Sequence, residues 1–276
     1  MKLFKKTLLI IILIPIALLG WGGKGHNIIT KYAMQLLPVE MNLSIDIKDA
    51  IIAHSIDPDL RKRDVKDEYP KYFIDIDFYK EFREGRMIQS YDSLLSIYGD
   101  SVVTDMGILP WATLQSYSYL VDAFMQKDKQ KIILYGSDIS HYIEDGHQPQ
   151  HTTLNYNGQL TNQTGIHFRY ESDMINKFLN EIEDRYYAIQ PGYISDLSGY
   201  IFDFISESNS YNELILTADR QASELTSDVF NDDYYNLLWF KTKYVTFNRV
   251  SMGANRTASL IYSAWVDAGK PQLDHL

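Results

Sequence analysis

Histidines and carboxylates occur in the middle of the chain at spacings that suit metal ligation. Residues 141–151 read HYIEDGHQPQH, so His141 and Asp145 are four residues apart and His151 follows Pro149. Side chains at positions i and i+4 share one helix face, where an imidazole and a carboxylate can converge on a single ion. A turn at the proline would let His151 approach that ion from the side.

A second pair repeats this spacing a short distance further on. His167 and Glu171 are again four residues apart, within GIHFRYESDM. One such pair on its own is more often a surface hydrogen bond than a metal site. Two pairs in a chain with 7 histidines favour ligation.

The segment 21–26 reads WGGKGH, and together with these pairs it resembles the superfamily of zinc-dependent phospholipases C and secreted single-strand-specific nucleases. In that family the terminal Trp of the mature chain binds zinc through its α-amine and carbonyl, and a nearby His joins it. The resemblance implies these roles for Trp21 and His26. It extends to about Glu171, and beyond that residue only general helicity matches.

The resemblance also implies three zinc ions, two of them bridged by Asp145. One bridged ion would take Trp21 and His26, the other Asp59 and His141, and the separate ion His151, His167 and Glu171. Nitrogen and oxygen ligands without sulfur independently suit zinc in a catalytic site. Asp59 lies in DPDLR, where Asp57 is the reserve candidate.

One position departs from the family pattern. Tyr72 stands in KYFIDID where the family has a histidine. A phenol has a reference pKa near ~10 and ligates zinc only after losing its proton. Three interpretations stay open at this point: Tyr72 ligates the metal, Tyr72 packs while water replaces the ligand, or the protein belongs to a lineage without full activity.

Other polar residues could take part in catalysis or support the ligands. Asp59 and Asp145 are expected at the catalytic centre, and Arg61 could clamp a phosphate by paired hydrogen bonds or be a solvated loop charge. Asp75 could orient a ligand, an idea that rests on the resemblance. His147 falls on another helix face and is interpreted as a structural hydrogen-bonding group. No partners can be named for His54 and His275.

The first twenty residues have the layout of a secretory signal peptide, with three lysines before an apolar run from Thr7 through Leu19. An uncleaved anchor is the alternative. Cleavage before Trp21 would remove three of the 26 basic residues and none of the 36 acidic ones, so the net charge would move from -10 to -13. Such a chain has no general attraction for duplex nucleic acid or anionic membranes. Zero cysteines exclude disulfides and thiolate ligands.

Helical periodicity dominates the remaining sequence. Apolar residues recur at helical spacing in 26–37, 132–143 and 250–265, and prolines or glycines follow these segments. Phe73 to Tyr79 alternates like a short strand, and Arg61 to Glu68 reads as a charged loop. We therefore expect an all-α fold of the phospholipase C and single-strand nuclease type, with one domain over residues 21–276.

The function expected from these features is zinc-dependent hydrolysis of phosphodiester bonds by a secreted or periplasmic enzyme. The Trp21–His26 offset resembles the nuclease branch, which favours single-stranded nucleic acid as substrate. The insertion before His167 resembles the phospholipase C branch, which cleaves phospholipid headgroups. A secreted protein that binds zinc without catalysis is the alternative of another class. The sequence indicates no protein partner.

Overall fold

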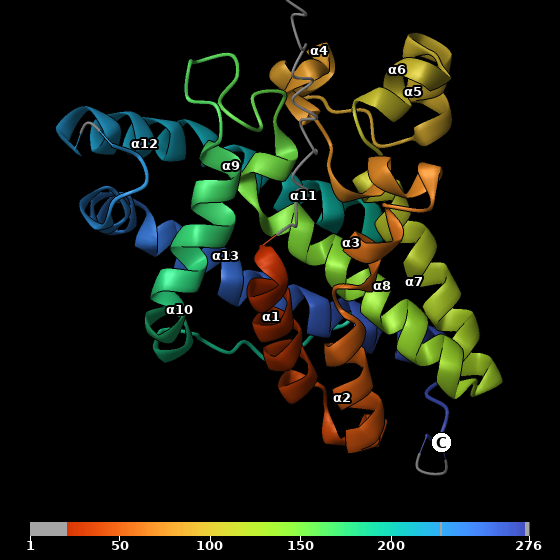
Figure 1. Ribbon diagram of the computed structural model, residues 1–276. Coiled ribbons are helices and arrows are strands. Elements are labelled where there is room, and N and C mark those ends of the chain that lie inside the picture. The colour runs from red at the N-terminus through yellow and green to blue at the C-terminus, as the bar shows by residue number, and fades with distance from the viewer. Residues whose placement is uncertain (1–20, 227, 274–275) are drawn as a thin grey trace, which may run out of the picture.

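A buried helix forms the centre of the protein. The computed structural model describes residues 21–226, 228–273 and 276, and within them α8 (Lys129–His147) crosses the middle of the fold (Figure 1). The helix begins where the Asp128 side chain accepts a hydrogen bond from the amide of Lys131. Every residue of α8 from position 136 onward is buried, so the polar side chains there need partners inside the protein.

Other helices surround α8 and pack against it. They are α1 (Gly22–Leu36), α2 (Ile45–His54), α7 (Leu109–Gln126), α11 (Leu197–Asn209) and α13 (Asp232–Asp267). Figure 1 shows α1 and α2 in front of α8 and the long α13 behind it. Two glycines of α8 permit this close packing, because a Cβ at Gly136 would stand 2.9 Å from Ile51 Cδ1 and one at Gly146 would stand 2.5 Å from Phe204 Cε2.

Shorter elements complete the fold. Between α2 and α7 lie α3 (Asp57–Arg61), η2 (Lys66–Tyr72), η3 (Ile76–Phe78), α4 (Lys80–Arg83), α5 (Tyr91–Tyr98) and α6 (Asp100–Asp105), and η1 (Val39–Met41) links α1 to α2. After α8 come η4 (Pro149–Thr152), α9 (Ile166–Phe168), the π-helical η5 (Arg169–Met174), α10 (Ile175–Asp184) and, beyond α11, α12 (Asn212–Thr226). One apolar core runs through the described residues from α1 to α13.

The all-α expectation is confirmed over the described residues, which contain helices and no strand. The three periodic segments fall within α1, α8 and α13. In the part of the chain that the structure describes, no helix combines the length and apolar character needed to cross a membrane. The expected signal peptide, residues 1–20, and His275 lie outside the described residues.

The strand expected at Phe73 to Tyr79 is wrong, because this segment has no neighbouring strand to pair with. Its amides instead bond to carbonyls of loops, with the Ile74 amide donating to His151 and the Asp75 amide donating to Met106. The chain then turns into the 3-10 helix η3. The loop expected from Arg61 to Glu68 is correct only in its first half, since η2 begins at residue 66.

Candidate metal centre

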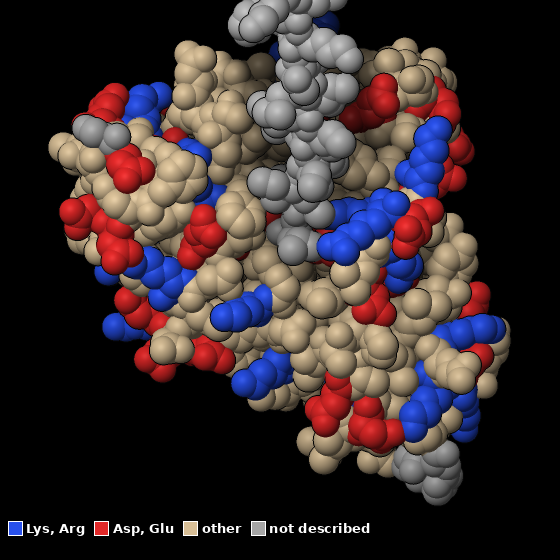
Figure 2. All heavy atoms as spheres, in the orientation of Figure 1, with Lys and Arg blue, Asp and Glu red and all other residues tan. Residues whose placement is uncertain are grey.

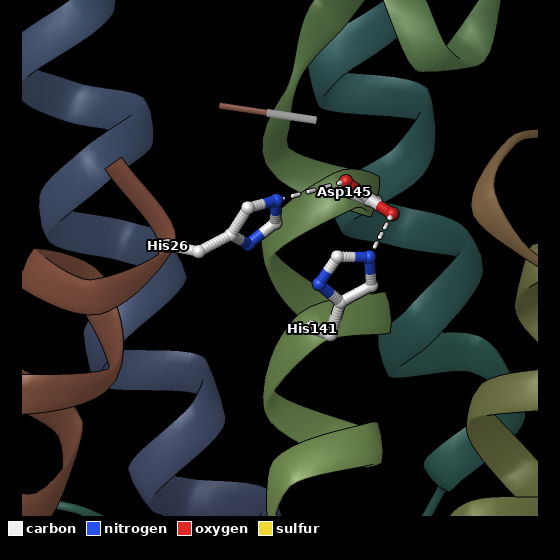
Figure 3. A group of neighbouring side chains, drawn as sticks. All are labelled: His26, His141 and Asp145. Atoms are coloured by element: carbon white, nitrogen blue, oxygen red, sulfur yellow. Dashed lines mark ion pairs between the residues drawn. The ribbon is translucent and has the colours of Figure 1, made fainter. Parts of the chain in front are cut away.

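Helices α1 and α8 bring three buried ligand groups together, although their residues are far apart in sequence. His141 and Asp145 project from one face of α8, and His26 reaches them from α1 (Figure 3). Asp145 lies between the two imidazoles: its Oδ1 is 3.6 Å from His26 Nε2 and its Oδ2 is 3.2 Å from His141 Nε2. The two rings stack with their centroids 4.2 Å apart. The structure therefore brings His26, the histidine expected from segment 21–26, together with His141 and Asp145 of the central segment.

A second group of three ligands lies beside the first. His151 follows α8 on η4, and His167 and Glu171 are one turn apart across the junction of α9 with η5. Glu171 Oε2 is 3.3 Å from His151 Nε2 and 3.0 Å from His167 Nε2. Asp145 Oδ1 is 3.7 Å from His151 Nδ1, so the two groups adjoin each other. Within the described residues these are the groups of histidine and carboxylate atoms close enough to hold an ion.

All four histidines are oriented by a hydrogen bond at Nδ1. The acceptors are a carboxylate oxygen of Glu144 for His26 at 2.6 Å, and the backbone carbonyls of Ser55 for His141 at 2.9 Å, Tyr72 for His151 at 2.7 Å and Tyr156 for His167 at 3.1 Å. A carbonyl can only accept, so Nδ1 carries the hydrogen in each case with a carbonyl partner. In the neutral ring, Nε2 then presents a lone pair, which is the arrangement that metal-binding histidines adopt.

The atoms that converge at the centre lack partners in the protein. Buried atoms without a hydrogen bond include Nε2 of His26 and of His141, both carboxylate oxygens of Asp145, and Oε1 of Glu171. In the other group, Nε2 of His151 lies 3.1 Å from Nε2 of His167 and 3.3 Å from Glu171 Oε2. Buried polar atoms normally have partners. A cation in each group would satisfy these atoms, so the residues fit metal ions.

The charges of the metal-free centre also favour cations. Burial acts to raise the pKa of Asp145, but His141 and His151 outweigh it and hold that pKa below its ordinary value. Burial likewise opposes a low pKa at Glu171, and His167 and His151 overcome it. Burial tends to lower the pKa of His151, whereas Asp145 and Glu171 raise it to about 9. The carboxylates therefore stay ionised, and His151 carries a proton that a metal would displace.

Sequence reasoning missed Glu144, which immediately precedes Asp145. Its side chain is fully buried; Oε2 accepts the short hydrogen bond from His26 and Oε1 accepts one from Thr30 at 2.6 Å. A carboxylate behind a ligating imidazole fixes the orientation of the ring. An acidic residue within an otherwise buried helix was the available sequence signal, but its partner could not be identified without the position of α1.

Asp59 and Asp57 have different surroundings in the structure. Both lie in the short helix α3. Asp59 is 1% exposed, and its Oδ1 is 3.7 Å from His141 Nε2. Asp57 faces outward and pairs with His54 at 2.7 Å. Asp59 is thus the carboxylate of this segment that belongs with the centre, and His54 has a partner that the sequence did not indicate.

The hydroxyl of Tyr72 is directed toward acceptors of the protein. It donates to the carbonyl of Pro58 at 2.7 Å and lies 3.1 Å from a carboxylate oxygen of Glu68. Its ring meets His141 edge-on, with centroids 5.3 Å apart. Burial and the adjacent Glu68 raise the pKa of the phenol above its ordinary value. Of the three interpretations, this geometry favours Tyr72 as a packing residue.

Arg61 and its neighbour Lys62 have different surroundings. The guanidinium of Arg61 forms ion pairs with Glu68 at 2.9 Å and Asp138 at 2.8 Å. Lys62 instead lines the pocket beside the metal centre and pairs with Asp59. Arg61 is therefore engaged in ion pairs within the protein, and its role as a phosphate clamp stays a prediction.

Trp21 and His147 are both buried near the centre. The indole of Trp21 donates to the carbonyl of Glu144 at 2.7 Å, which holds the start of α1 against α8. Ligation by the Trp21 amine and carbonyl stays a prediction. His147 bonds the carbonyl of Ile143 through Nδ1 and accepts from Arg256 through Nε2, which agrees with the structural role expected for it.

A pocket of ≈ 220 Å³ opens beside the second group of ligands. His151 and His167 form part of its wall, and the rings of Tyr69, Phe73 and Tyr156 form another part. The polar lining also includes Gln150 and three charged residues, Lys62, Asp75 and Asp105. The pocket therefore combines metal-ligating residues with flat aromatic surfaces.

No family model matches the sequence of this chain, and no curated protein sequence matches it either.

Proposed function

We propose that this protein hydrolyses phosphodiester bonds at a centre of clustered zinc ions, as the resemblance noted in the sequence implies. One observation carries the proposal: two adjoining groups of buried ligand atoms lie next to a pocket, His26, His141 and Asp145 in one and His151, His167 and Glu171 in the other. The converging atoms of the first group, and Oε1 of Glu171 in the second, lack hydrogen-bond partners. An all-nitrogen and oxygen ligand set supports zinc as the metal.

The composition of each group supports catalysis over a purely structural role. Structural zinc sites are generally closed by four protein ligands. Here each group supplies three side chains, and Asp145 adjoins both. Positions would therefore be open to substrate and water. Clustered zinc supplies a nucleophilic water at neutral pH and stabilises negative charge on phosphoryl oxygens.

The protein's own residues would prepare this chemistry. The Nδ1 hydrogen bonds to Glu144 and to three backbone carbonyls hold the imidazoles in place before substrate arrives. The Lys62 ammonium lies on the wall of the pocket, where it would bind a phosphoryl oxygen. No covalent intermediate with the protein is required.

Single-stranded nucleic acid is the substrate that we propose first. Tyr69 and Phe73 form an adjacent aromatic pair, with ring centroids 5.4 Å apart, on the pocket wall. Bases of a single strand can stack on such rings. Basic and acidic side chains are mixed over the described face of the molecule in Figure 2. That face offers no broad basic surface for a duplex, so the binding of a short single strand would depend on this pocket.

Cleavage of phospholipid headgroups is the second candidate, and a separate observation favours it. Asp75 and Asp105 lie in the same pocket as the aromatic rings of Tyr69, Phe73 and Tyr156. Aromatic rings together with carboxylates bind quaternary ammonium groups such as choline. The pocket would then hold the headgroup while the metal centre holds the phosphate.

One set of parallel assays tests these proposals. Protein purified from cells that express the full chain is loaded with zinc and incubated with single-stranded RNA, single-stranded DNA, phosphatidylcholine vesicles and a chromogenic phosphodiester. We expect zinc-dependent hydrolysis of the chromogenic ester and of single strands. Preferential lipid cleavage would select the second candidate. A fully metallated protein that is inert toward all four substrates would establish a non-catalytic zinc-binding protein instead.

We also propose export of the protein, with cleavage before Trp21. Mass spectrometry of the purified protein checks this directly, and we expect a chain that begins at Trp21. If its amine is a ligand, a form with one extra residue before Trp21 should bind zinc more weakly. Equal affinity in the two forms would remove Trp21 from the ligand set.

A further inference from the structure

The ammonium of Lys62 occupies a buried position between Asp59 and Tyr72. Lys62 Nζ donates to Asp59 Oδ1 at 2.6 Å, and this same oxygen is 3.7 Å from His141 Nε2. The ammonium also lies over the ring of Tyr72, 5.0 Å from its centroid. The Lys62 side chain is only 10% exposed. A positive charge of the protein itself is thus held beside Asp59 and Tyr72, where the resemblance implied a third zinc ion.

Most of the atoms expected to bind that third ion have other partners. The Tyr72 hydroxyl donates to Pro58 and adjoins Glu68, so ligation would require the loss of a hydrogen bond and a second negative charge beside Glu68. Asp59 Oδ1 accepts from Lys62, which leaves Oδ2 as the oxygen of Asp59 without a hydrogen bond. His141 Nε2 already converges with His26 and Asp145 on one ion position. These residues do not fit a third metal ion.

The balance of charge leads to the same result. Asp59, Asp145 and Glu171 are the buried carboxylates at the ligand positions. Two divalent cations together with the Lys62 ammonium already exceed their negative charge. A third divalent cation would add two more positive charges in a buried region beside the ammonium, where like charges repel strongly.

We propose that the centre holds two divalent cations and that Lys62 takes the place of a third. This inference rests on the proposed function and deepens it. The ammonium would balance Asp59 and attract a phosphoryl oxygen in the pocket that Lys62 lines with His151 and His167. Lysine provides a compact positive charge on a flexible stem, which suits this role.

The number of bound metal ions tests the inference without an activity assay. Purified protein is saturated with zinc, freed of excess metal by gel filtration and analysed by inductively coupled plasma mass spectrometry. We expect two zinc ions per chain in the wild type and in Lys62→Met. Three ions in the wild type would overturn the inference while leaving the proposed function intact. A protein that retains no zinc would overturn both.

A double variant supplies the complementary result. Tyr72→His together with Lys62→Met restores an imidazole and removes the competing ammonium, so we expect a third zinc ion to bind. Cobalt loading of the same proteins, followed by visible absorption, checks that the added ion has protein ligands. If the double variant binds only two ions, then Lys62 and Tyr72 are not what excludes the third, and the inference fails.

Hydrolysis of the chromogenic phosphodiester then tests the role of the charge. We expect Lys62→Ala to lower kcat by about 100-fold, as loss of one transition-state contact to charge does, and added methylammonium to restore part of the rate. The matched control is Lys71→Ala, because Lys71 pairs with Glu68 at 2.8 Å and lies outside the pocket lining. An unchanged rate in Lys62→Ala, with two zinc ions bound, would show that the ammonium has no part in hydrolysis.

Discussion

Two buried carboxylates, Asp145 and Asp219, show opposite hydrogen-bonding states. Asp219 Oδ1 accepts from Arg169 Nη2 at 2.9 Å and from the Tyr234 hydroxyl, and its Oδ2 accepts from Gln163 at 2.6 Å. Both oxygens of Asp145 lack a hydrogen-bond partner. Burial is almost complete for both residues. The protein therefore completes the surroundings of one buried charge and leaves those of the other incomplete.

This difference indicates that neighbouring residues of the segment 163–171 have separate roles. Arg169 donates to Asp219 and also to the carbonyls of Gln163 and Thr164, which ties the preceding loop to η5. The same segment carries His167 and Glu171, the ligands on either side of Arg169. The Arg169–Asp219 ion pair thus helps to hold in place the segment that carries His167 and Glu171. A buried charge without a partner is costly, so the ligand group with His167 and Glu171 is the one whose surroundings a cation could complete.

The largest expected effect comes from removing the charge of Asp145, the carboxylate without hydrogen-bond partners. Asp145→Asn takes away a carboxylate that adjoins both ligand groups, so we expect loss of bound zinc from both. Hydrolysis of the chromogenic phosphodiester should fall on the order of a thousandfold, since the charge stabilisation by metal is lost. Elemental analysis and steady-state kinetics measure the two quantities. Full zinc content in Asp145→Asn would show that the Asp145 carboxylate is not needed to hold the metal.

Removing Asp219, whose two carboxylate oxygens both have hydrogen-bond partners, should lower the stability of the fold instead. Asp219→Ala leaves the Arg169 guanidinium buried without its counter-charge, which costs about 3–5 kcal/mol. Urea unfolding of the metal-free protein measures this loss. Folded Asp219→Ala should still bind zinc with the wild-type stoichiometry. The control is Asp233→Asn, an exposed carboxylate of α13; if it destabilises the protein equally, the Asp219 network has no special role.

Both oxygens of Glu144 have hydrogen-bond partners, as those of Asp219 do. One of these partners is His26, whose Nε2 lacks a partner, as the oxygens of Asp145 do. Glu144→Gln weakens the hold on His26 Nδ1, and we expect zinc affinity to fall by about 10–100-fold. Competition with a chromogenic chelator measures the affinity. Thr30→Val, which removes only the hydrogen bond to Glu144 Oε1, should have a smaller effect. An equal or larger effect of Thr30→Val would show that Glu144 acts through packing.

The smallest effect concerns a carboxylate at the edge of the open centre. Burial and Asp77 raise the pKa of Asp75 to about 7, against the opposing influence of His151. The folded state then holds this proton more tightly than the unfolded chain does. The contribution of Asp75 to the free energy of unfolding therefore falls as pH rises from the unfolded pKa to about 7.

Asp75→Asn should remove this loss. Because solvent in the pocket weakens the shift, we expect the variant to gain on the order of 1 kcal/mol relative to the wild type at high pH, and nothing below the unfolded pKa. Urea unfolding in EDTA at pH 4 and pH 8 measures the difference. The exposed Asp105 of the same pocket provides the control, and a gain for Asp75→Asn that is equal at both pH values would exclude titration as its cause.

The sequence by itself determined the features that depend on local spacing. His141 with Asp145, and His167 with Glu171, had to share a helix face once those segments were helical, and apolar periodicity predicted the helices. The strand wrongly predicted at residues 73–79 marks the limit of this reasoning, because alternation indicates a strand only when another strand is present to pair with it.

Only the tertiary structure decided which groups face one another. The packing of α1 on α8 brought His26 to Asp145 and placed Glu144 behind it. The resemblance favoured Asp59 over Asp57, but spacing alone does not fix which charged side chains of DPDLRK face inward, because they are neighbours in sequence and differ in the direction that α3 and the following turn give them. A difference of direction is set by long-range packing, and in this protein it separates an outward ion pair from a candidate metal centre.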